Sequence, residues 1–277
     1  CFFRPNKSKE VYFFMSAKKQ KGRRPPVWVS QNFLTSHKTI ERVLRRTNLR
    51  ADDHVIEIGP GKGHTTGRLL QKCRKVTAIE IDGKLYAGLL EKFSDAENLR
   101  LHHQDFLKWK LPFSGRYKVF ANLPFCYTTD ILRKLTESKN PPVEAWLTME
   151  KGAAKRFMGK PRETLRSLLI KPKFDLDVVY YFHREDFHPK PGVDVVMVHI
   201  KKKAQPDVSS SRWNDYRHFL SGALGNGGVG LRHMFTKRQL SRAYQEAGIR
   251  DAPSGEILYI QWLCLFRCYC DHVIHKY

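Results

Sequence analysis

Short apolar runs alternate along the chain with segments in which apolar residues recur at helical spacing. The apolar runs lie at 54–59, 76–81, 99–102, 117–122 and 143–149. Helical spacing is found at 36–47, 65–73, 83–93, 128–137 and 150–158. Strands that alternate with helices are typical of a parallel sheet wrapped by helices. We therefore predict an α/β fold for this part of the protein.

Two further apolar segments follow this alternation. The segments 176–183 and 193–200 are rich in β-branched and aromatic residues, as strands are. Between them, the prolines of 187–191 interrupt the chain and cannot continue either strand. The economical interpretation is an antiparallel pair that closes the sheet.

A change in composition marks the start of another region. After the lysine run 201–203 the chain is rich in Ser, Pro and Gly, and domain boundaries commonly fall in such linkers. Helical spacing then returns near 212–224, 235–247 and 256–270. We predict three parts: a basic N-terminal arm at 1–29, an α/β domain at 30–205 and a small all-helical C-terminal domain at 206–277.

The charge of the protein narrows the class of its partners. Fifty Lys and Arg against 27 Asp and Glu give a formal net charge of +23, which favours a polyanionic partner. The sequence contains no run of 18 apolar residues, so it predicts no membrane span. Six cysteines are too few for a dense disulfide framework, which favours a cytoplasmic protein. We further expect a monomer whose natural start is Met15.

The first candidate site is the glycine-rich turn Glu57–Gly63, which follows a predicted strand and opens a predicted helix. Glycines in this position let a ligand approach the backbone closely. A phosphate-binding P-loop needs Ser or Thr where Gly63 stands. Pro60 removes a backbone donor that a dinucleotide would use, which weakens that alternative without excluding it. S-adenosylmethionine (SAM), which has no phosphate, suits this turn better.

Positions further along the chain suit the same ligand. Glu80 ends the second predicted strand, where its carboxylate can accept both ribose hydroxyls; the alternative is a solvated acid. Asp105 follows the third strand and can accept from the adenine amino group, while Phe106 can cover the adenine ring. Together with the glycine-rich turn, these residues predict a SAM site.

Asn122, Leu123, Pro124 and Phe125 lie at the carboxyl end of the fourth predicted strand, where open α/β sheets hold ligands. The Asn122 amide oxygen and a backbone carbonyl held by Pro124 can accept from an adenine amino group, making its nitrogen more nucleophilic. Phe125 can stack on that adenine. Phe187 is a second candidate for stacking, with a buried core residue as the alternative. The motif predicts methyl transfer to an adenine amino group.

In order and spacing, these motifs resemble the rRNA adenine N6-dimethyltransferase family, and more narrowly its erythromycin-resistance (Erm) branch. The resemblance runs from about residue 30 to residue 266 and also includes 31–34, 150–154 and 187–191. It implies a Rossmann-like SAM-dependent methyltransferase sheet, with Asn122 and Phe125 at the target amine. The expected SAM-binding residues are Gln31, Asn32, Leu34, Glu57, Gly59, Gly61, Glu80, Ile81, Asp105, Phe106 and Asn122.

The Erm branch acts on an adenine near the peptidyl-transferase centre of 23S rRNA. The resemblance therefore implies 23S rRNA as the partner and resistance to macrolides, lincosamides and streptogramin B. The segments 235–240 and 261–266 look more like this branch than like the small-subunit (16S-type) dimethyltransferases, which remain an alternative. Another is a non-catalytic nucleic-acid binder, like the relatives recruited to mitochondrial transcription. One departure is Phe125, where many relatives have Tyr.

Cysteines and histidines near the end of the chain do not predict a metal site. Cys264, Cys268, Cys270, His272 and His275 lack a Cys-x-x-Cys pair, and Cys264 falls on an apolar helical face. We therefore predict SAM as the cofactor and no metal.

Overall fold

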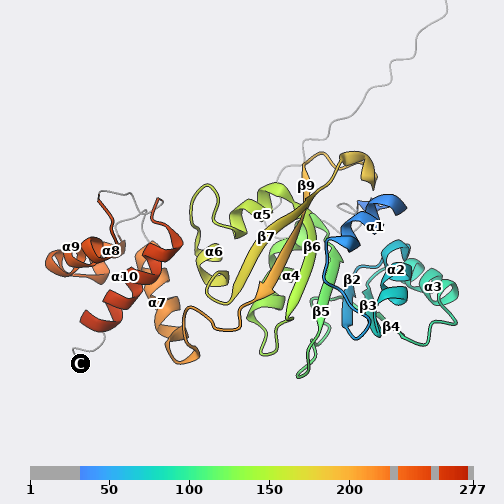
Figure 1. Ribbon diagram of the computed structural model, residues 1–277, viewed down its shortest axis with the longest axis horizontal. Helices are drawn as coiled ribbons and strands as arrows, with labels where there is room; N and C mark the ends of the chain where they lie inside the picture. Colours follow the sequence, from blue (N-terminus) through green and yellow to red (C-terminus); the bar gives the residue numbers. More distant parts are fainter. Residues whose placement is uncertain (1–31, 225–229, 251–255, 274–277) are drawn as a thin grey trace, which may run out of the picture.

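The computed structural model describes residues 32–224, 230–250 and 256–273. Its centre is a seven-stranded sheet in the order β4-β3-β2-β5-β6-β9-β7 (Figure 1). The strands are β2 (His54–Ile58), β3 (Lys75–Glu80), β4 (Leu99–His103), β5 (Lys118–Asn122), β6 (Glu144–Glu150), β7 (Phe174–Tyr181) and β9 (Val195–Lys202). β2 to β6 pair in parallel, whereas β9 runs antiparallel to β6 and β7. The predicted α/β class and its antiparallel closing pair are confirmed.

The central strands are apolar on both faces because each face carries its own layer of helices. In β2, Val55 packs into a cluster that includes Ile40 of α1 (His37–Arg45) and Leu69 of α2 (His64–Lys72). The next residue, Ile56, packs on the opposite face with Leu132 of α4 (Thr128–Glu137) and Ala154 of α5 (Lys151–Phe157). Both strand residues are fully buried. Because β2, β3 and β5 run parallel, their carboxyl ends meet at one edge of the sheet, where such sheets bind ligands.

The helices α1 to α5 match the predicted helical segments, and side-chain caps set where two of them begin. Ser36 accepts a hydrogen bond from the Thr39 N–H at the start of α1. Asp82 accepts from the N–H groups of Lys84 and Leu85 at the start of α3 (Gly83–Lys92). Caps of this kind satisfy backbone donors that have no partner within the helix.

Several short elements were not predicted from the sequence. β1 (Phe33–Leu34) pairs antiparallel with β8 (Phe187–His188), so part of the segment expected to interrupt the sheet is itself a two-residue strand. Strands of two residues have no alternation to detect. The other short elements are the helices α6 (Leu165–Ile170) and α8 (Gly230–Met234) and the 3₁₀ turns η2 (Phe125–Tyr127), η3 (Arg184–Asp186) and η4 (Ser210–Arg212).

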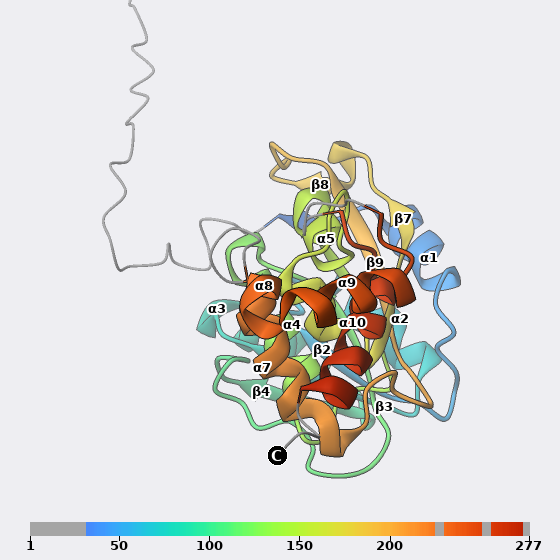
Figure 2. The same cartoon turned by 90° about the vertical axis from the view of Figure 1, so that its left-hand side faces the viewer.

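The C-terminal helices form a separate core. They are α7 (Trp213–Leu224), α8 (Gly230–Met234), α9 (Lys237–Glu246) and α10 (Tyr259–His272), and Figure 2 views them in front of the sheet. Phe219 and Trp262 are fully buried between them. Leu168 of α6 joins this core, and its carbonyl accepts a hydrogen bond from the Tyr216 hydroxyl at 3.0 Å. A segment from before residue 206 thus packs with the C-terminal helices, and the domain limits stay a prediction; the arm at 1–29 lies outside the described residues.

Within the described ranges, no helix is long and apolar enough to cross a membrane. A group of three or more side chains that could hold a metal ion is likewise absent from these ranges. The cysteines that the structure describes are free thiols, and burial raises the pKa of Cys73 to about 11 and that of Cys268 to about 12. Such thiols stay protonated at neutral pH and are unreactive.

Glu57 is a buried acid beneath the glycine-rich turn. Its side chain is inside β2, with an exposed fraction of only 3%, and its Oε2 accepts a hydrogen bond of 2.7 Å from the Thr66 hydroxyl of α2. Burial raises the pKa of Glu57 to about 7, and the Thr66 hydrogen bond offsets this only in part. The bond ties β2 to α2 across the turn that joins them.

We predict that Glu57 makes the stability of the protein fall as pH rises. The pKa of Glu57 is about 7 in the folded protein, against an ordinary value of 4.5. Between these two pH values the folded state therefore binds a proton that the unfolded state has released. The free energy of unfolding should drop across this window by up to about 3 kcal/mol. Denaturant unfolding at about pH 5 and about pH 7.5 measures the drop. Glu57→Gln should reduce it, whereas Glu91→Gln, at an exposed helical position, should leave it unchanged.

Candidate functional site: a pocket at the carboxyl edge of the sheet

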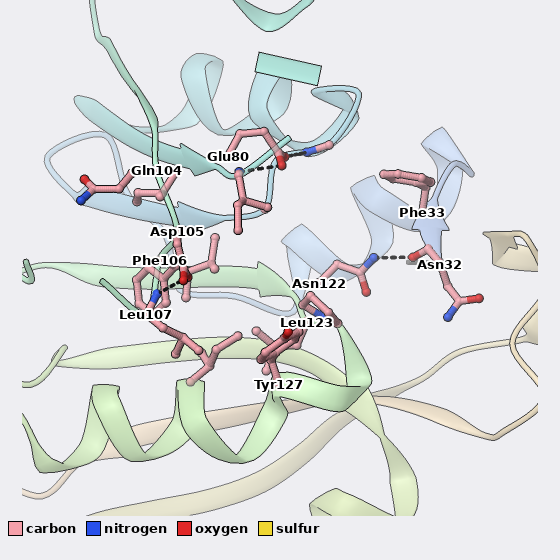
Figure 3. A pocket seen from close by; sticks show the side chains of 17 residues that line it. Asn32, Phe33, Glu80, Gln104, Asp105, Phe106, Leu107, Asn122, Leu123 and Tyr127 are labelled. Carbon is pink, nitrogen blue, oxygen red and sulfur yellow. Dashed lines mark hydrogen bonds between the residues drawn. The ribbon is translucent and has the colours of Figure 1, made fainter. Parts of the chain in front are cut away.

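A pocket opens over the carboxyl ends of β2, β3 and β5 (Figure 3). The space within it and its open mouth together amount to about 830 Å³. The residues predicted from the sequence that line it are Asn32, Gly59, Gly61, Glu80, Ile81, Asp105, Phe106, Asn122, Leu123 and Pro124. Residues far apart in the sequence are thus brought together in one cavity.

The glycine-rich turn forms one wall of the pocket. Gly59 and Gly61 have φ values of +65° and +58°, which L-residues with side chains rarely adopt. A Cβ on Gly61 would also lie 2.9 Å from the ring of Phe33, so this position has no room for a side chain. The turn therefore presents bare backbone to a ligand.

Glu80 holds this turn against the end of β3. Its carboxylate is only 2% exposed and accepts three backbone N–H groups, from Gly61 through Oε2 at 3.0 Å and from Ile81 and Asp82 through Oε1 at 2.9 and 3.0 Å. A carboxylate offers about four acceptor sites, so one direction remains for a ligand hydroxyl. This arrangement fits a ribose at the end of β3.

Asp105 begins a tight turn after β4, next to the end of β3, where the Gln104 N–H donates to the Glu80 carbonyl at 2.9 Å. Its Oδ1 accepts the Leu107 N–H at 2.8 Å, and its backbone carbonyl accepts the N–H groups of Lys108 and Trp109. Phe106 is 6% exposed, whereas Ile81, which also lines the pocket, is 43% exposed. Apolar walls and one carboxylate are the features that a flat base with a polar edge requires.

The described lining disfavours a ligand that carries phosphate. It includes the carboxylates of Glu80 and Asp105 but no Lys or Arg. A pyrophosphate would meet these acids without a cationic side chain to offset the repulsion. A dinucleotide would therefore depend on backbone N–H groups alone, of which Pro60 removes one, whereas a ligand with a sulfonium and an ammonium group meets carboxylates of opposite charge.

Asn122 is held in one orientation at the mouth of β5. Its Nδ2 donates to the backbone carbonyl of Asn32 at 2.7 Å, as Figure 3 shows. With the amide nitrogen engaged, the side-chain oxygen is the group that Asn122 offers to a ligand. Leu123 is anchored by its N–H to the Thr148 carbonyl of β6, which fixes the chain before Pro124.

Four residues expected at the site do not line this pocket. Glu57 lies beneath the turn, and Leu34, with an exposed fraction of 6%, is part of the core. Phe125 is partly buried against the same core. Phe187 is 2% exposed in β8 and packs against Phe182, which agrees with the alternative of a buried core residue, and its stacking role stays a prediction. Gln31 lies outside the described residues.

Other residues line the pocket without having been expected there. They are Phe33, Ile58, Ile79, Gln104, Leu107, Tyr127 and Ile131. Most are apolar and follow or precede a motif residue directly, so adjacency was the available signal. Tyr127 and Ile131 had no such signal, because they reach the pocket only through the 3₁₀ turn η2 and the start of α4.

Comparison with known proteins agrees with this geometry. The family model described as ribosomal RNA adenine dimethylase matches residues 28–254. A rRNA adenine N-6-methyltransferase of Limosilactobacillus reuteri is 35% identical over 87% of this chain and 95% of its own length. One of Bacillus licheniformis is 33% identical over 90% of this chain and 89% of its own length.

Solved structures share the fold. The 23S rRNA methyltransferase ErmE is 27% identical with a TM-score of 0.77, covering 86% of this chain and 99% of that one. A dimethyladenosine transferase from Plasmodium falciparum, 19% identical with a TM-score of 0.71 over 84% of this chain and 95% of its own, shows the fold alone. The family, the enzyme class and the methyl donor predicted from the sequence are confirmed. This chain belongs to the ribosomal RNA adenine dimethylase family of SAM-dependent methyltransferases.

Proposed function

We propose that this protein, as a cytoplasmic monomer, methylates the N6 amino group of an adenine in 23S rRNA and thereby confers resistance to macrolides, lincosamides and streptogramin B. The observation that carries the choice of 23S rRNA is the similarity to ErmE, which this chain covers over 99% of its length at 27% identity. The net charge of +23 also fits an RNA substrate, because phosphate contacts supply much of the affinity for nucleic acid.

SAM, when bound, supplies a methyl group that is already activated on a sulfonium. Glu80 would hold the ribose with the acceptor capacity left by its three backbone donors. Asp105 would accept from the adenine amino group of SAM, and Ile81 and Phe106 would cover the adenine ring. The bare backbone at Gly61 leaves room for the ligand beside β2.

Asn122 would prepare the target amine. The nitrogen of an adenine amino group is a weak nucleophile because its lone pair is delocalised into the ring. Acceptors at Asn122 Oδ1 and at the backbone carbonyl preceding Pro124 would hold both N–H groups and draw the nitrogen toward a tetrahedral form. The hydrogen bond from Asn122 Nδ2 to Asn32 fixes the acceptor before the base arrives. Preorganised groups of this kind lower the barrier because they need no rearrangement during the reaction.

Alignment of the two reactants would supply most of the rate acceleration. Holding reacting groups in line is worth up to about 7–11 kcal/mol. Phe125 remains the proposed stacking residue for the target adenine, since it directly follows Pro124 and is only partly buried. A target base in structured RNA must first leave its stack, at a cost of a few kcal/mol.

Incubation with labelled SAM and separated ribosomal RNAs tests the proposal. We expect label in the large-subunit RNA at the N6 position of one adenine. Label in the small-subunit RNA would instead indicate a 16S-type dimethyltransferase, and no label in either RNA would indicate a non-catalytic binder. Expression in a macrolide-sensitive bacterium should raise the inhibitory concentration of a macrolide, a lincosamide and streptogramin B together.

We predict that Asn122→Ala lowers methylation by about 100-fold to 1000-fold, as loss of one preorganised polar contact does in other enzymes. The measurement is mass mapping of methylated adenine in rRNA from cells that carry each variant. Asn98→Ala is the matched control: Asn98 also donates through Nδ2 to backbone carbonyls, those of Leu70 and Cys73, but does not line the pocket. Equal activity of the two variants would contradict the role of Asn122.

We predict that Glu80→Gln weakens binding of S-adenosylhomocysteine by about 10-fold to 100-fold. The substitution replaces an acceptor of three backbone N–H groups by an amide that directs its own N–H groups toward one side of that cluster. Calorimetric titration without RNA measures the affinity. Glu57→Gln is the control, because Glu57 is also buried but does not line the pocket, and this variant should bind the ligand like the wild type. A loss of affinity in Glu57→Gln would restore Glu57 as a ligand contact.

A further inference from the structure

Lys134 of α4 gathers the carbonyl groups of the turn that begins at Asp105. Its Nζ donates to the carbonyls of Phe106 at 2.6 Å and Leu107 at 2.9 Å, and also to that of Trp109. The same ammonium lies 5.0 Å from the centre of the Phe106 ring. All three protons of this ammonium can therefore be used within the protein, in contrast to those of an exposed lysine on a basic surface.

The turn is thus fixed from two sides. Asp105 accepts the N–H groups of Leu107, Lys108 and Trp109, so the donors of the turn converge on its first residue. The carbonyls converge on Lys134 instead. Burial lowers the pKa of Lys134, and the carboxylate of Asp105 acts in the opposite direction.

The residues held in this way form one wall of the pocket. Asp105, Phe106 and Leu107 all line it, whereas Lys134 itself does not. A change of the turn would move the carboxylate of Asp105 and the ring of Phe106, which line the pocket. Lys134 can therefore control this wall without touching the ligand.

We propose that Lys134 is a positioning residue that fixes the 105–109 turn so that the pocket selects an adenine over other purine bases in the methyl donor. The proposal rests on the proposed function for the contact between Asp105 and the base of that donor. The compact ammonium suits the task, since it directs three donors to neighbouring carbonyls.

Asn140 also holds the loop between β4 and β5, and it allows the proposed role of Lys134 to be distinguished from a general effect on loop stability. Farther along, Asn140 donates through Nδ2 to the carbonyls of Pro112 and Gly115 at 3.2 and 3.0 Å. Neither of these residues lines the pocket. Both side chains stabilise the connection between β4 and β5, but only Lys134 holds residues that line the pocket.

Binding of two ligands by the full chain, without RNA, tests the proposal. S-adenosylhomocysteine and S-inosylhomocysteine differ only in the base, where the amino donor and ring-nitrogen acceptor of adenine become an oxygen and an N–H. The wild type should prefer the adenosyl ligand. Lys134→Met, which keeps the length of the side chain and removes its donors, should reduce this preference by about tenfold or more. Hydrogen exchange of the amides at 107–109 should become faster in the same variant.

Two control variants and one milder substitution complete the experiment. Arg133→Met removes a neighbouring charge on a side chain that is 66% exposed. Asn140→Ala removes the hydrogen bonds to the carbonyls of Pro112 and Gly115. Both variants should keep the wild-type preference for the adenosyl ligand. Lys134→Gln keeps amide donors and replaces Lys134→Met if that variant does not fold, with an intermediate preference expected.

Each result decides between the proposals. A wild-type preference in Lys134→Met and Lys134→Gln would overturn the role of Lys134 and leave the proposed function intact. An equal loss of preference in Asn140→Ala would also overturn it, because loop stability alone would then explain the effect. A wild type that binds neither ligand would overturn both proposals.

Discussion

The carboxylate of Glu80 joins the two chain segments on which the pocket depends. Buried at the end of β3, it requires hydrogen-bond donors, and it finds them in the turn after β2 and in the residues that open α3. The glycine turn is in this way held against the neighbouring strand. The carboxylate that holds the turn in place is therefore the same one that is proposed to accept a ribose hydroxyl.

The other half of the pocket depends on contacts between distant parts of the chain. Asn122 at the end of β5 is oriented by the carbonyl of Asn32, and the residues after Asn32 form β1, which pairs with β8. The Thr39 hydroxyl adds a 2.6 Å hydrogen bond to Asp186, just before β8. The side-chain oxygen that is proposed to accept from the target amine is therefore positioned by a segment that precedes β2, and this segment pairs with residues that lie between β7 and β9.

The sequence was sufficient where local pattern determines structure. Alternating apolar runs predicted the strands, and the positive φ of Gly59 and Gly61 follows from the turn they occupy. The sequence was not sufficient where long-range packing decides. Phe187 is buried because a two-residue pairing draws it onto β1, and no periodicity signals so short a strand. In the sequence, nothing distinguishes Lys134 from other charged residues of a helix, because the carbonyls that it binds lie 25 to 28 residues earlier.

The pairing of β1 with β8 bears on how the protein is made. β1 is synthesised before every strand of the seven-stranded sheet, yet its partner β8 leaves the ribosome only after more than half of the chain has been synthesised. Until then, the carbonyl of Asn32 has no β-bridge to hold it near Asn122. In a growing chain, the glycine turn and Glu80 are therefore synthesised well before β8, and the contact between Asn32 and Asn122 gains the support of the β1–β8 pair only afterwards.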